Sequence, residues 1–153
     1  MAILAFTIVI FFILGLSQTS YIVLASSADN GKSGIVTLAE LKVAIQDPSV
    51  LIIDVRQPIE LIETGVIPNS INIPLDKLEN TLKNQTPQSF LQQYKRQKPP
   101  FDTTIIFTCR SGKRSGQAQK IALNLGFVNT KNYGGGWLEW EANLNKTDEA
   151  RGS

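Results

Sequence analysis

The stretch from residue 104 to residue 125 constrains the fold of this chain most, because it predicts a strand, a polar loop and a helix in direct succession. Thr104-Ile105-Ile106-Phe107-Thr108 is rich in β-branched and aromatic residues, which is typical of a strand. From about Ser115 onward, apolar residues recur at helical spacing: Ala118, Ile121, Ala122 and Leu125. Gly126 follows, where a helix commonly ends. A buried strand followed at once by a helix favours a parallel sheet covered by helices.

The rest of the chain continues this alternation. Thr37 and Glu40 have the spacing of a capping box, so a helix is expected to begin there. Short buried strands are expected at 50–53 and 71–73, and an edge strand at 129–133. Further helices are expected at 75–82, 87–96 and 137–144. The sequence therefore predicts one α/β domain over residues 35–144, with a polar linker before it up to Gly34 and a polar tail over 145–153.

The residue types that the chain lacks narrow its chemistry. It has no histidine and a single cysteine, Cys109. Histidine is the commonest general base and metal ligand, so Ser-His-Asp hydrolysis and a Cys-His protease are excluded. One cysteine can build neither a zinc site nor an internal disulfide. The net charge of +2 is too small for a nucleic-acid-binding surface. Any chemistry at Cys109 must therefore activate the thiol without an imidazole.

Cys109 opens the loop between the predicted strand and helix, whose sequence is Cys109-Arg110-Ser111-Gly112-Lys113-Arg114. A loop that curls into a helix N-terminus points its backbone N–H groups at one spot, and a glycine permits the tight backbone that this needs. The three cations of the loop are expected to surround that spot. Helix N-termini and nearby cations lower the pKa of a thiol below its usual value of about 8.5. The loop therefore predicts an anion-binding pocket with a thiolate at its floor, and the plain alternative is an inert buried cysteine.

Four segments, in this order, resemble the rhodanese homology domain: Asp54-Val55-Arg56, Ile71-Asn72-Ile73-Pro74, Cys109 to Ser115, and Asn132-Tyr133-Gly134-Gly135-Gly136-Trp137-Leu138-Glu139-Trp140. The resemblance covers about Ile35 to Leu144 and implies a doubly wound α/β domain with a central parallel sheet. It also implies that the loop cysteine becomes a persulfide, whose outer sulfur passes to a thiol or to cyanide, with no cofactor. The short layout is most similar to small thiosulfate sulfurtransferases that pass sulfur to glutathione, and it favours a monomer.

By position, the resemblance makes Cys109 the sulfur carrier and assigns the rest of the loop to substrate binding: Arg110, Ser111, Gly112, Lys113, Arg114 and Ser115. Backbone amides would make the main contacts, the cations would attract the sulfonate of thiosulfate, and Ser115 would hydrogen-bond the outer sulfur. Asp54 and Arg56 would lie behind these residues, although Asp54 could simply cap a turn. The chain departs from the family in having Gly65-Val66-Ile67-Pro68 where a histidine often follows the glycine.

Two other functions stay open at this point. A cysteine phosphatase or arsenate reductase also holds a thiolate in a ring of amides, but related phosphatases of this fold place five residues between cysteine and arginine. Only four separate Cys109 from Arg114, which makes a smaller ring. A non-catalytic docking or sensing module is the other alternative, and the retained cysteine argues against it. The glycines at 134–136 lack the lysine of a phosphate-binding loop, so a close-packed turn is expected there.

The first part of the chain is apolar over residues 2–16 and again over 21–25. Its length favours a signal peptide within residues 1–28, with Ala25 and Ala28 as small-residue cleavage sites, and hence the secretory pathway. The alternative is a membrane anchor through residues 2–25, for which Lys32 on the C-terminal flank would place the domain in the cytosol. Asn84 and Asn145 begin tripeptides that match the glycosylation sequon.

Overall fold

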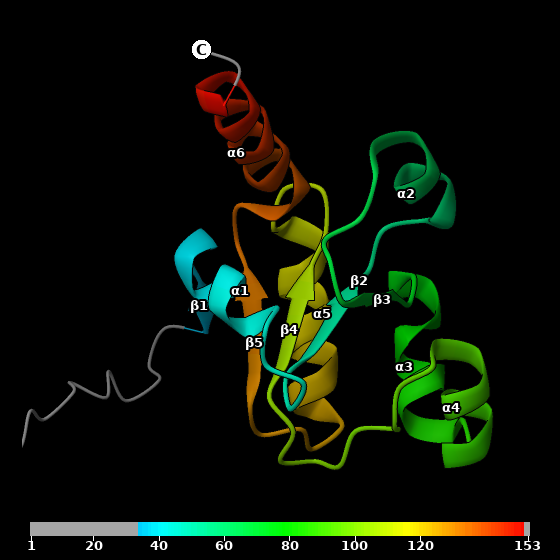
Figure 1. Ribbon diagram of the computed structural model, residues 1–153. Coiled ribbons are helices and arrows are strands. Elements are labelled where there is room, and N and C mark those ends of the chain that lie inside the picture. Colours follow the sequence, from blue (N-terminus) through cyan, green and yellow to red (C-terminus); the bar gives the residue numbers. More distant parts are fainter. Residues whose placement is uncertain (1–33, 152–153) are drawn as a thin grey trace, which may run out of the picture. The chain divides into compact units, whose positions relative to one another are not determined.

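The computed structural model describes residues 34–151, with side chains described up to residue 144. The apolar segment at residues 1–28 and the interpretations placed on it lie outside the described residues. Eleven elements follow one another along the described chain: β1 Ile35–Val36, α1 Leu38–Ala44, β2 Leu51–Asp54, α2 Pro58–Thr64, β3 Ser70–Asn72, α3 Leu75–Asn84, α4 Pro87–Tyr94, β4 Ile105–Thr108, α5 Lys113–Asn124, β5 Thr130–Tyr133 and α6 Gly136–Arg151 (Figure 1).

The five strands form one parallel sheet in the order β1-β5-β4-β2-β3. The α/β fold with a central parallel sheet is therefore confirmed. The expected edge position of β5 is wrong, because β5 lies between β1 and β4. Ile35 and Val36 pair with Asn132 and Tyr133, and two paired residues are enough to cover that edge. The edge strand on this side is β1, which is too short to stand out in the sequence.

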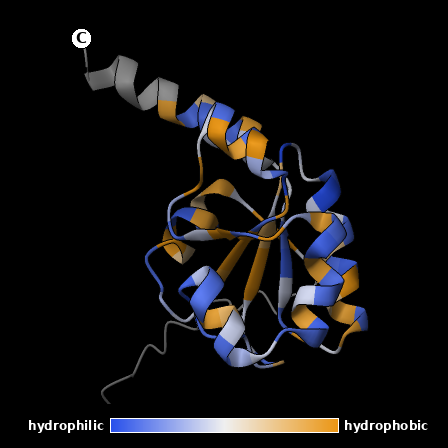
Figure 2. Cartoon of the chain, turned by 90° about the vertical axis from the view of Figure 1, so that its right-hand side faces the viewer, coloured by the Kyte–Doolittle hydropathy of each residue, from blue (hydrophilic) through white to orange (hydrophobic). Residues whose placement is uncertain are grey.

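Helices cover both faces of the sheet, as a doubly wound fold requires. On one face, α3, α4 and α5 pack against the strands through Leu78, Phe90 and Ala118, all of them fully buried. On the other face, α1 and α6 contribute Leu41, Trp137 and Trp140 to a second cluster. The central strands β2 and β4 are mainly apolar, and the helices turn hydrophilic sides outward (Figure 2). The prediction of strands buried on both faces is confirmed, since every residue of β2 and β4 is buried.

The ends of the helices follow local sequence signals in part. The capping box at α1 is confirmed, because the Glu40 amide donates to the Thr37 hydroxyl and the Thr37 amide donates to the Glu40 carboxylate. Helix α5 begins at Lys113, earlier than expected, and α6 continues through residues 145–151, which were expected as a tail. Helix α2 was not predicted. None of the helices within the described residues is both long and apolar enough to cross a membrane.

The parallel strands bring the loops that follow them to one edge of the sheet. Strand β2 ends at Asp54 and strand β4 ends at Thr108, and these two residues are partners in the ladder. Helix α2, the loop between β4 and α5, and the start of α6 gather at this edge (Figure 1). Sites in open α/β sheets form beyond the carboxyl ends of the strands, so this is the region to search for chemistry.

Candidate active site

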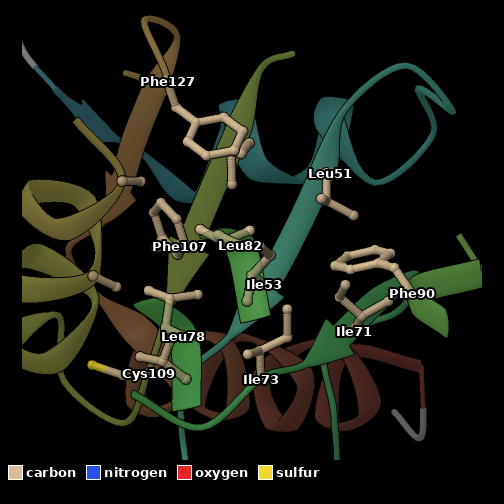
Figure 3. Packing of buried hydrophobic residues seen from close by; sticks show 14 residues of the cluster. Leu51, Ile53, Ile71, Ile73, Leu78, Leu82, Phe90, Phe107, Cys109 and Phe127 are labelled. Atoms are coloured by element: carbon tan, nitrogen blue, oxygen red, sulfur yellow. The ribbon is translucent and has the colours of Figure 1, made fainter. Parts of the chain in front are cut away.

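Cys109 stands directly after β4, at the edge of the core cluster beside Leu78 (Figure 3). Only 1% of its surface is exposed. Gly112, three residues on, has φ 81°, a left-handed conformation that costs a glycine nothing. A Cβ at this position would overlap the carbonyl group of Gly134. The glycine therefore lets the chain turn tightly from the cysteine into the first turn of α5.

The glycine-rich segment before α6 closes the loop from outside. The Trp137 amide donates to the Cys109 carbonyl at 2.8 Å, and the Leu138 amide donates to the Arg110 carbonyl at 3.1 Å. Gly136 has φ 59°, and a Cβ there would lie 2.6 Å from the same Cys109 carbonyl oxygen. The close-packed turn predicted for these glycines is confirmed. With its carbonyls bound on the outside, the loop is free to turn its amides inward.

The thiol of Cys109 is surrounded by hydrogen-bond donors. The Ser115 hydroxyl donates to Sγ at 3.3 Å, and Ser115 is fully buried. Burial raises the pKa of the Cys109 thiol, but hydrogen bonds from the Ser115 hydroxyl and from the backbone N–H groups of Ser115, Ser111 and Arg114 outweigh burial, so the pKa lies below its ordinary value. The site therefore favours the thiolate without a histidine.

The three cations of the loop are not equivalent, contrary to the expectation from sequence. Arg114 forms a two-point ion pair with Glu60 of α2, with nitrogen–oxygen distances of 2.6 and 2.7 Å. Arg110 and Lys113 are exposed, and neither has a side-chain partner among the described residues. Two loop cations therefore offer an unneutralised charge to an anion, and the third shares its charge with a carboxylate.

Asp54 and Arg56 form a buried ion pair at the end of β2, with a nitrogen–oxygen distance of 2.7 Å and 1% exposure on both side chains. The Arg56 amide also donates to the Asp54 carboxylate, so the predicted turn-capping role of Asp54 is confirmed. The Arg56 guanidinium donates to the Thr64 hydroxyl at 2.8 Å and to the Gly65 carbonyl at 2.9 Å, and it lies 4.8 Å from the ring centroid of Trp137. The pair therefore fastens the C-terminal end of α2 to the sheet.

Glu60 is the site residue that sequence reasoning missed. A signal was present, because Gln57 and Glu60 have capping-box spacing and Pro58 occupies the first helical position. The ion pair with Arg114 holds the pKa of the Glu60 carboxyl at about 2, so it is charged at neutral pH.

As for metals, no group of three His, Cys, Asp or Glu side chains within the described part of the chain could hold an ion.

The comparison with known proteins agrees with this geometry. The rhodanese-like domain family matches residues 37–143, which include the whole loop and the glycine-rich segment. The chain belongs to the rhodanese-like family. Mouse thiosulfate sulfurtransferase/rhodanese-like domain-containing protein 3 is 41% identical over 105 residues, which cover 69% of this chain and 66% of the mouse protein.

A human relative and a solved human structure extend the likeness. Human thiosulfate:glutathione sulfurtransferase is 36% identical over 106 residues, which cover 69% of this chain and 90% of the human protein. The structure of a human single-domain sulfurtransferase superposes with a TM-score of 0.65 at 34% identity, covering 71% of this chain and 95% of the other. The rhodanese-like domain described here therefore has sulfurtransferases of similar size among its relatives.

Proposed function

We propose that this chain is a thiosulfate sulfurtransferase that carries sulfur on Cys109. The Cys109 thiolate attacks the outer sulfur of thiosulfate, the sulfur–sulfur bond of the donor breaks, and sulfite leaves with the bonding electron pair. The product is a Cys109 persulfide with the same charge as the starting thiolate. An acceptor thiolate or cyanide then attacks the outer sulfur and leaves Cys109 as a thiolate. Atoms and charge balance in both steps, and no cofactor enters.

Each part of the loop has a place in this reaction. The amides of Ser111, Arg114 and Ser115 stabilise negative charge on sulfur, first on the thiolate and then on the persulfide. The Ser115 hydroxyl, already directed at Sγ, donates to the persulfide. Arg110 and Lys113 attract the doubly charged donor from solvent. Glutathione is the acceptor suggested by the human relative that carries it in its name.

The observation that carries the proposal is an almost completely buried thiol that accepts a hydrogen bond from the Ser115 hydroxyl. This bond and the backbone amides around the sulfur lower the pKa of the thiol. At this depth the sulfur is reached by the narrow end of a donor, such as the outer sulfur of thiosulfate. A phosphoryl group would need room for its oxygens around the attacking atom. Burial and the short loop together favour transfer of one sulfur atom over phosphate chemistry.

The experiment is a mass measurement on the peptide that contains Cys109. Incubation with thiosulfate is expected to add the mass of one sulfur atom, and glutathione or cyanide is expected to remove it. Cys109→Ser is the control and is expected to fold and to gain no sulfur. Absence of the added sulfur, in protein whose thiol still reacts with iodoacetamide, would refute the proposal.

For the segment at residues 1–28 we propose a cleaved signal peptide, since its apolar run ends before small residues at Ala25 and Ala28. The mature domain would then enter the secretory pathway. Sequencing the N-terminus of the protein after expression in eukaryotic cells tests this. A membrane-bound product that retains Met1 would favour the anchor instead.

A further inference from the structure

Glu60 lies in an unusual helix. Helix α2 buries none of its own side chains, and the apolar residues Ile59 and Ile62 are 57% and 80% exposed. Polar contacts hold the helix at the edge of the site. At one end Glu60 binds Arg114, and at the other the Arg56 guanidinium binds the last turn. The position of α2 is therefore fixed by polar contacts with Arg114 of the cysteine loop and with Arg56, and not by burial in the hydrophobic core.

The carboxylate of Glu60 is held in one orientation by its own helix. Its Oε2 atom accepts from the Gln57 amide at 2.9 Å, and both of its oxygens accept from Arg114. The two side chains keep about a quarter to a third of their surface exposed, 25% for Glu60 and 32% for Arg114. A fixed negative charge thus stands beside the most enclosed cation of the loop.

We propose that Glu60 is a specificity-determining residue that limits the positive charge facing the sulfur. Arg110, Lys113 and Arg114 supply three positive charges. The negative charge of Glu60 offsets one of them, that of Arg114. The site then attracts a doubly charged donor less strongly than the loop alone would. Sulfite, an anion, has to leave the site before the anionic acceptor can reach the same sulfur. A smaller positive charge at the site holds sulfite less strongly and so favours this exchange. This inference rests on the proposed sulfur transfer.

The test compares two donors that differ in charge. Thiosulfate carries two negative charges, and methanethiosulfonate delivers the same outer sulfur with one. A unit charge about 7 Å from a monoanion in a water-like dielectric changes its binding constant roughly threefold, before salt screening. The same charge changes the binding constant of a dianion roughly sevenfold. Glu60→Gln removes the charge but keeps an oxygen that can accept from the Gln57 amide. At low salt it is expected to raise kcat/KM for thiosulfate, and to raise the thiosulfate-to-methanethiosulfonate ratio roughly threefold.

Glu63→Gln is the matched control. It makes the same change of charge on the same helix, at an exposed residue with no side-chain partner among the described residues. It is expected to leave the donor ratio unchanged. An unchanged or lower ratio in Glu60→Gln would overturn the proposal, because a purely structural role would lower the activity with both donors alike.

A second substitution separates charge from positioning. Arg114→Gln leaves the Glu60 carboxylate at the edge of the cysteine loop without its partner, so the use of thiosulfate is expected to fall. Adding Glu60→Gln removes the repelling charge and is expected to restore part of the lost kcat/KM. If Glu60 acted only by holding Arg114 in place, the double variant would be no better than Arg114→Gln alone, and the proposal would fail.

Alkylation of Cys109 tests the same charge without any sulfur transfer. The rate with iodoacetate, an anion, divided by the rate with iodoacetamide, which is neutral, reports the potential at the sulfur. Glu60→Gln is expected to raise this ratio and Glu63→Gln to leave it unchanged. If the wild-type protein transferred no sulfur but this ratio rose, the proposed function would be wrong while the electrostatic role of Glu60 stood. An unchanged ratio in Glu60→Gln would refute that role itself.

Discussion

The hydrogen bond from Ser115 to Cys109 gives a quantitative test of how the thiol is activated. Ser115→Ala removes the only side-chain donor to Sγ among the described residues and leaves the backbone donors in place. A hydrogen bond to a charged group contributes about 1.5–3 kcal/mol. Because the backbone donors remain, we expect the lower end of that range, which is roughly a tenfold change in the ionisation equilibrium. The pKa of the Cys109 thiol is expected to rise.

The assay is the rate of iodoacetamide alkylation over a range of pH. The curve for Ser115→Ala should move to higher pH, and persulfide formation at neutral pH should slow by up to about tenfold, in proportion to the thiolate. Thr108→Val is the control, because Thr108 adjoins Cys109 and its buried hydroxyl has no hydrogen-bond partner among the described residues. It is expected to leave the curve in place. If the curves of wild type and Ser115→Ala coincided, the backbone amides alone would set the thiol pKa.

Three further predictions concern stability and are checked by urea unfolding. Gly112→Ala should lower the free energy of unfolding by about 3 kcal/mol or more, since it adds a Cβ in a left-handed, crowded position. Gly116→Ala is the control: a Cβ there would make an ordinary 3.4 Å contact, and the free energy of unfolding should rise by up to about 1 kcal/mol. Asp54→Asn should cost about 3–5 kcal/mol, because it leaves the buried Arg56 charge without its partner. The pKa of the Glu60 carboxyl is lowered from 4.5 to about 2, so its ion pair should add about 1 kcal/mol to the free energy of unfolding above pH 4.5. This contribution should be lost as the pH falls toward 2, and Glu60→Gln should abolish that part of the acid dependence.

Features that rest on neighbouring residues were predictable from the sequence. The capping box of α1 needs only Thr37 and Glu40, and the sharp turn after β4 needs only the glycine at 112. The alternation of apolar strands and helices was enough to predict the parallel sheet, because both faces of β2 and β4 are buried. The cysteine loop could be located for the same reason, since its strand and its helix frame it in a single segment.

Features that rest on contacts between distant segments were not predictable in this way. Helix α2 shows no apolar stripe toward the core, because Ile59 and Ile62 face solvent, so periodicity could not find it. Its position depends on Arg114, which lies 54 residues further along the chain. The edge strand was misplaced because β1 is formed by two residues and acquires its role only by pairing with β5.

The activation of the thiol combines both kinds of information. The sequence supplies the donors, since Ser111, Arg114 and Ser115 lie within six residues of Cys109. Their convergence on the sulfur, however, requires that the loop carbonyls be bound elsewhere, and the amide of Trp137 binds one of them. The glycine-rich segment donates no hydrogen bond to the thiol, but it binds the outer side of the loop whose amides lower the pKa of that thiol. For this reason the glycine-rich segment and the cysteine loop have to be considered together, because neither motif by itself explains a thiol of lowered pKa in a chain without histidine.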